Sequence, residues 1–71
     1  MNKKITIAID AMGGENSPKK TINGIDLFIK KNISNDDFFL NIYGDKILIQ
    51  NEIKKYKIPS HLFKIIHTDS V

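Results

Sequence analysis

Residues 4–10 read Lys-Ile-Thr-Ile-Ala-Ile-Asp, a short β-branched run that ends in an acid. Because successive side chains of a strand point to opposite faces, the isoleucines share one face, and the threonine and alanine share the other. Both faces are therefore apolar or small, which predicts a strand covered on both sides, as in a parallel sheet.

The segment after this strand predicts a loop followed by a helix. Residues 11–17 contain the pair Gly13-Gly14, which is typical of a loop. Ser17-Pro18 is a good helix start, because a hydroxyl residue at the N-cap and a proline at the first helical position are both favoured. Isoleucines then recur at steps of three and four, which predicts a helix with one buried face. They are Ile22, Ile25, Ile29 and Ile33.

Residues 38–43 predict a second strand, and residues 63–67 predict a third. Between them, Asp45 is expected to cap a second helix that runs to about Tyr56 and ends before a proline. The order strand, helix, strand, helix, strand favours an α/β fold with parallel strands and right-handed crossovers. Because two helices cannot cover both faces of such a sheet, we expect the 71 residues to form the incomplete opening segment of one larger α/β domain.

The composition narrows the class of protein. The hydrophobic fraction of 41% and the charged fraction of 27% are ordinary for a globular protein. The chain has no cysteine, which excludes disulfides and thiolate zinc sites, and its two histidines are too few for a metal centre. We therefore expect no metal and no cofactor. No apolar run approaches the ~20 residues of a membrane span, and the first residues lack the features of a signal peptide, which favours the cytoplasm.

The net charge of +3 does not by itself indicate nucleic-acid binding. All eleven basic residues are lysines, which are scattered in pairs rather than gathered in one stripe. Arginine, which binds phosphate or guanine through two parallel hydrogen bonds, is absent from the sequence. We therefore expect no nucleic-acid partner.

The loop from Asp10 to Pro18 is the segment expected to carry chemistry. In open α/β sheets, ligands bind beyond the carboxyl ends of the strands, which is where this loop is predicted to lie. Gly13 and Gly14 let backbone amides approach a ligand and permit positive φ. The helix start behind them favours an anion. Two roles stay open for Asp10: it orients a substrate, or it hydrogen-bonds the glycine loop.

Three charged residues flank this helix start. Lys19 and Lys20 are expected in the first turn, where a cation is disfavoured by about 0.3–1 kcal/mol. A bound phosphate would remove that penalty, but we favour the simpler interpretation that both lysines are solvated. Glu15 is expected to interact with the helix dipole rather than to take part in chemistry.

The other polar residues near this edge have structural interpretations. Gly44-Asp45 is expected to form a turn and a helix cap. His67 ends the third strand at the same edge as Asp10, and a single histidine there is expected to be hydrogen-bonded structure. His61 is expected to lie on the surface.

Two familiar phosphate loops are excluded. The sequence has no G-x-G-x-x-G, since the glycine that follows Gly13 and Gly14 is Gly24, and it has no G-x-x-x-x-G-K-[ST]. A third loop, that of actin-like sugar kinases, predicts a β-hairpin over residues 5–24. Here the glycines lie one position later, and Ser17-Pro18 opens a helix where that fold needs a second strand.

Residues 7–18 read Ile-Ala-Ile-Asp-Ala-Met-Gly-Gly-Glu-Asn-Ser-Pro. This run resembles the amino-terminal signature of the bacterial phosphate acyltransferases of phospholipid synthesis, in which a strand leads into Asp-x-Met-Gly-Gly-Asp and a proline starts the first helix. The downstream order of elements is similar too, so the resemblance spans the chain but only the first part of a family member. Glu15 departs from the pattern, since the family usually has aspartate there.

The resemblance implies a function. Family members transfer a fatty acyl group from acyl carrier protein to inorganic phosphate, which makes acyl phosphate for the glycerol-3-phosphate acyltransferase. Their fold is a three-layer α/β/α arrangement similar to the phosphotransacetylase and isocitrate dehydrogenase group, and they act as homodimers loosely associated with the membrane. The resemblance implies that Asp10, Gly13 and Gly14 line the substrate cleft.

The same resemblance assigns no catalytic residue within this chain, and the isolated segment is expected to be inactive. Two other hypotheses stay open at this point. One is the opening segment of an actin-like sugar kinase, and the other is a small non-enzymatic binding module or the remnant of a decayed gene.

Overall fold

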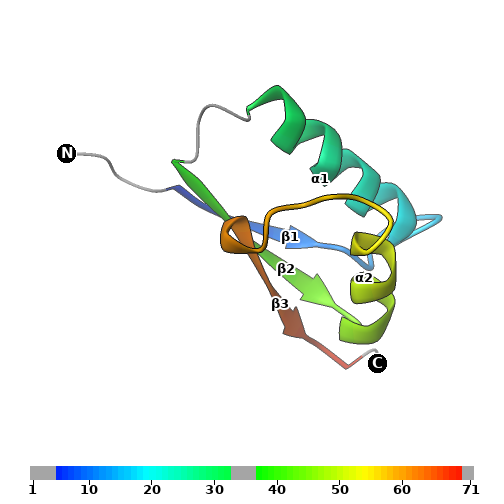
Figure 1. Ribbon diagram of the computed structural model, residues 1–71. Coiled ribbons are helices and arrows are strands. Elements are labelled where there is room, and N and C mark those ends of the chain that lie inside the picture. Colours follow the sequence, from blue (N-terminus) through cyan, green and yellow to red (C-terminus); the bar gives the residue numbers. More distant parts are fainter. Residues whose placement is uncertain (1–4, 33–36, 70–71) are drawn as a thin grey trace.

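The computed structural model of the chain describes residues 5–32 and 37–69. Strands and helices alternate along it, which confirms the predicted α/β order (Figure 1). In chain order the elements are β1 (Ile5–Asp10), α1 (Lys19–Lys31), β2 (Phe38–Gly44), α2 (Lys46–Ile53), the 3₁₀ helix η1 (Ser60–Leu62) and β3 (Phe63–His67).

The three strands form one parallel sheet in the order β1-β2-β3. Ile7 of β1 lies opposite Leu40 of β2, which in turn lies opposite Phe63 of β3. The parallel pairing of β1 with β2, together with α1, is incompatible with a β-hairpin over residues 5–24. The sugar-kinase hypothesis is therefore wrong.

One face of the sheet carries the core. Because the strands step in one direction, right-handed crossovers place both helices on the same face. Alternate residues of β2 are buried there and pack in one cluster with residues of α1 and α2. The predicted isoleucine stripe of α1 is confirmed at three positions, and its fourth, Ile33, lies outside the described residues. The cluster includes Ile22, Ile25, Ile29, Leu40, Ile42 and Ile49.

The other face of the sheet is not covered by a helix within the described residues. On this face of β1, Thr6, Ala8 and Asp10 are exposed. The expectation that this strand is covered on both sides is therefore met on one face only. The reason is the strand order, which puts both crossover helices on the same side.

The end of the second helix and the segment after it differ from the prediction. The second helix ends at Ile53 and not near Tyr56, because the amides of Lys55 and Tyr56 bond to carbonyls three residues back, at Glu52 and Ile53. The short helix η1 was not predicted. Strand β3 has the predicted bounds. None of the helices in the described part of the chain has the length and apolar content needed to cross a bilayer.

Candidate functional site

The loops that follow the three strands start from one edge of the sheet. The parallel ladder continues past the strand ends, since the Ala11 amide donates to the Tyr43 carbonyl at 2.9 Å and the Thr68 amide donates to the Gly44 carbonyl at 3.0 Å. This carboxyl edge is where open α/β sheets bind ligands. The candidate site is therefore the loop between β1 and α1 together with the chain segments beside it (Figure 1).

Asp10 fixes the start of this loop. Its Oδ1 accepts a hydrogen bond from the amide of Met12 at 3.0 Å. Its Oδ2 faces Gly13, where an added Cβ would lie 3.2 Å from that oxygen, closer than most side chains tolerate. Asp10 thus ties the loop, as one of its two predicted roles requires. The amide that it holds is that of Met12, next to the glycine pair.

The glycine pair is exposed at the tip of the loop. Gly14 has a φ of +85°, which few residues other than glycine adopt readily, and an added Cβ there would meet nothing within 4 Å. Asn16 also has a positive φ, of 63°. Residues 12–16, Glu15 among them, are all exposed, so the turn is open to solvent.

The start of α1 differs from the prediction. The helix begins at Lys19, with Pro18 at the N-cap, and among the described residues no side chain caps it. Ser17 was expected to be the cap, but its hydroxyl donates to the carbonyl of Gly13. The hydroxyl thus closes the loop on itself and leaves the helix start without a side-chain acceptor.

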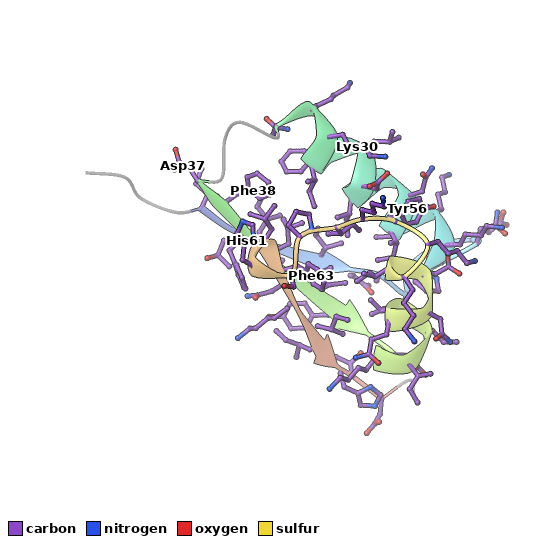
Figure 2. The ribbon with its side chains drawn as sticks, in the orientation of Figure 1. Lys30, Asp37, Phe38, Tyr56, His61 and Phe63 are labelled. Carbon is purple, nitrogen blue, oxygen red and sulfur yellow. The ribbon has the colours of Figure 1, made fainter. Side chains whose placement is uncertain are left out.

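Both lysines of the first turn lie where they were predicted. Lys19 and Lys20 are exposed, and the turn contains no acidic residue. Beside them is an open hollow of about 470 Å³, which Asn16, Asn23 and Tyr56 also line. Figure 2 shows Tyr56 near α1, where the chain returns after α2. Cationic, amide and phenol groups therefore line one hollow beside the start of α1, which has no side-chain cap.

At the turn between β2 and α2, in contrast, side chains accept the hydrogen bonds of the helix start. Asp45 caps α2 as predicted, since its Oδ1 accepts from the amides of Ile47 at 3.0 Å and Leu48 at 3.2 Å. The preceding amide, of Lys46, donates to Nδ1 of His67 at 3.1 Å. The side chains of two residues therefore accept hydrogen bonds from three consecutive amides at the start of α2.

His67 has the structural role that was predicted. Because its Nδ1 accepts the Lys46 hydrogen bond, its Nε2 is the protonated nitrogen, and it lies 3.1 Å from Oδ1 of Asp69. His61 is exposed on η1, at the opposite end of β3 from the loops, as Figure 2 shows. Neither histidine joins a group of three metal-ligating side chains within residues 5–32 and 37–69.

Met12 is the residue that sequence reasoning missed. A Cβ added at Gly44 would lie 2.5 Å from Met12 Cγ and 3.0 Å from Ile49 Cδ1, so the Met12 side chain rests against the backbone of Gly44. Met12 and Asp45 also line a hollow of about 300 Å³ between the loops. No sequence signal could have found this contact, because a local pattern shows neither that Gly44 is buried nor which side chain meets it.

Comparison with known proteins supports the resemblance seen in residues 7–18. The curated relatives include a phosphate acyltransferase of Pelagibacter ubique (strain HTCC1062), which is 53% identical over 68 residues, or 96% of this chain and 19% of that protein. Phosphate acyltransferases of Streptococcus pyogenes serotypes M6 and M1 are 43% identical over 63 residues, or 89% of this chain and 17% of each relative.

These matches confirm the predicted resemblance to phosphate acyltransferases. The chain spans about a fifth of the length of the curated relatives it matches. No protein-family model matches the chain.

Proposed function

We propose that this chain, which phosphate acyltransferases match over nearly its whole length, is the anion-binding opening segment of such an enzyme. The reaction is transfer of a fatty acyl group from acyl carrier protein to inorganic phosphate, with acyl phosphate as the product. The observation that carries the proposal is the exposed loop Asp10–Pro18 at the carboxyl edge of a parallel sheet, in a sequence 53% identical to a phosphate acyltransferase.

The chemistry needs little from this segment beyond holding phosphate. A phosphate oxygen attacks the carbonyl carbon of the thioester, a C–O bond forms, the C–S bond breaks, and the carrier-protein thiolate leaves. Phosphate is itself the nucleophile, so the segment does not have to supply a nucleophilic side chain. It has to bind an anion in a fixed orientation, and the groups that stabilise the developing oxyanion are proposed to lie elsewhere in the full enzyme.

Three features support phosphate binding at the loop. Gly13 and Gly14 are exposed, and the space around Gly14 is open, while Gly13 lies beside the carboxylate of Asp10. The start of α1 has no side-chain cap among the residues described, so the positive end of its dipole faces the loop. Lys19 and Lys20 add positive charge in the first turn, where a bound phosphate would offset the cost of placing cations at a helix start. Asp10 then acts by holding the loop.

The larger setting is also a proposal. The chain would form the first part of one α/β domain, whose further layer covers the open face of the sheet at Thr6 and Ala8. By itself the segment would be inactive. The full enzyme would act in the cytoplasm as a homodimer, loosely associated with the membrane, and would supply acyl phosphate to glycerol-3-phosphate acyltransferase. Nucleic acid is not among the proposed partners.

The test is a chimera in which this chain replaces the matching 68-residue segment of the Pelagibacter ubique enzyme. We expect the chimera to form acyl phosphate from acylated carrier protein and phosphate, at a rate within about tenfold of the parent, because the remaining four fifths supply the other groups. The 71-residue chain alone is expected to give no product. A chimera that folds and dimerises like the parent but makes no acyl phosphate would contradict the proposal.

Two glycine variants test whether the glycine pair takes part in phosphate binding. Gly14→Val in the chimera is expected to lower kcat/KM for phosphate by roughly tenfold or more, because valine strains a backbone with φ of +85°. Gly24→Ala is the matched control, since Gly24 lies in α1 with open space around it and does not border the loop. Equal effects of the two changes would argue against a role for the glycine pair.

A further inference from the structure

The side chain of Met12 joins the glycine loop to the central strand of the sheet. It rests against Gly44, where even a single added carbon would come within 2.5 Å of Met12 Cγ and 3.1 Å of its sulfur. Met12 is only 37% exposed, although residues 12–16 otherwise form an open turn. The contact therefore covers part of a flexible side chain, one residue after Ala11, whose amide donates to the Tyr43 carbonyl of β2.

Met12 is held at two points. Its amide donates to Oδ1 of Asp10 at 3.0 Å, and its side chain rests against Gly44 beside Ile49. A residue fixed at both backbone and side chain has a defined peptide orientation, and the next peptide in the chain begins the glycine pair. Gly13 and Gly14 have no side chains of their own to set their direction. Their orientation must come from the residues on either side.

The other flank of the glycine pair is closed locally. The Ser17 hydroxyl donates to the Gly13 carbonyl, which is a contact within the loop and gives no reference to the sheet. On the other side of the glycine pair, Met12 contacts the sheet itself. Its partner Gly44 is buried at the end of β2, and the Gly44 carbonyl accepts a hydrogen bond from the Thr68 amide at 3.0 Å. Beyond the buried Ala11, Met12 is thus the side chain next to the glycine pair that contacts the edge of the sheet.

We propose that Met12 is a positioning residue: the packing of its side chain against Gly44 sets the direction in which the Gly13 and Gly14 N–H groups point toward a bound phosphate. The inference rests on the proposed phosphate-binding function of the loop and deepens it. It also gives Gly44, thirty-two positions along the chain from Met12, a role beyond that of a turn. A side chain added at position 44 would displace the Met12 side chain and change the orientation of the loop.

The experiment titrates inorganic phosphate into the ¹⁵N-labelled chain and follows the amide signals of Gly13 and Gly14. We expect Met12→Ala to raise the Kd for phosphate by about tenfold, the order expected when a preorganised geometry is loosened. Met12→Leu fills the same seat and is expected to stay close to the wild type. Leu48→Ala is the matched control, since Leu48 lines the same 300 Å³ hollow but lies on α2.

A merely structural role for Met12 would lower stability without changing phosphate affinity in the folded molecules. The amide signals of Ala11 and Ile42, at the loop start and in β2, report whether each variant keeps the sheet. If Met12→Ala does not fold, Met12→Val removes the sulfur while keeping part of the bulk. A folded Met12→Ala or Met12→Val chain that binds phosphate as the wild type does would overturn the proposal.

A second readout separates this inference from the proposed function. Residual dipolar couplings give the directions of the Gly13 and Gly14 N–H bonds in the phosphate-free chain. We expect Met12→Ala to turn them relative to the sheet, and Met12→Leu to leave them in place. Unchanged directions in Met12→Ala overturn the positioning role. If the wild-type chain shows no phosphate response while Met12→Ala still turns these bonds, the phosphate site fails and the positioning role stands.

Discussion

The two turns that lead from a strand into a helix are built from similar residues and have opposite properties. Each contains glycine with positive φ and an aspartate near the strand end. In the second turn, Asp45 and His67 take three consecutive amides at the start of α2. In the first turn, the aspartate bonds to the loop, and no side chain in the described part of the chain caps α1.

The difference shows how to separate a structural turn from a binding turn. A helix start whose amides are already satisfied by the protein has nothing to offer an anion, and its residues act on stability. The start of α1 has no side-chain cap, and one of its amides, that of Lys20, donates to the Asn16 carbonyl at 2.9 Å, so what it offers an anion is the remaining first-turn amide groups, the helix dipole and two lysines. Substitutions in the two turns test this contrast.

Gly44→Ala should have the largest effect on stability. The added carbon meets Met12 and Ile49, and the φ of +156° disfavours a side chain, so we expect a loss of about 2–4 kcal/mol in the free energy of unfolding. Urea unfolding followed by circular dichroism measures it. Gly24→Ala, at an open helical position, should stabilise the chain slightly. If Gly44→Ala and Gly24→Ala have the same effect on the free energy of unfolding, the close contact at Gly44 does not contribute to stability.

Asp45→Ala should cost about 1 kcal/mol of unfolding free energy, because it removes the acceptor for the amides of Ile47 and Leu48. Ser17→Ala is the comparison in the first turn, and it should cost less, since the Ser17 hydroxyl bonds within the loop and does not cap α1. Asp45→Asn keeps a capping oxygen and should lie within a few tenths of a kcal/mol of the wild type. The contrast between the turns fails if Ser17→Ala proves the more damaging change.

Lys19→Glu should have the smallest effect on stability and should change its sign with the ligand. Without phosphate, an acid in the first turn of α1 should raise stability by about 0.3–1 kcal/mol, because it complements the helix dipole. With phosphate present, the same change should weaken the stabilisation that the anion gives. Thermal unfolding with and without phosphate measures both effects.

Lys31→Glu makes the same change of charge in the last turn of α1, where a cation is favoured. It should lower stability whether or not phosphate is present. If Lys19→Glu responds to phosphate no differently from Lys31→Glu, the first-turn lysines are solvated side chains without a ligand.

Local sequence patterns determined the elements and their order. Short apolar runs rich in β-branched and aromatic residues mark the strands, and the isoleucine spacing marks α1, because each pattern reflects the geometry of its own element. Residues with a special backbone or capping preference, such as Gly14 and Asp45, mark the turns between the elements. From this order and the position of Gly13-Gly14, the sequence placed the candidate loop at the ligand-binding edge of a parallel sheet.

Tertiary structure alone decided which residues meet. The patterns gave no reason for Met12 to rest on Gly44, for His67 to accept from Lys46, or for Asp26 to be buried at 4% exposure beside Lys30. They also left open the direction in which the strands step, and hence which face of the sheet stays bare. These outcomes depend on packing between segments distant in the sequence, whereas a local pattern records only the preferences of the chain within a few residues.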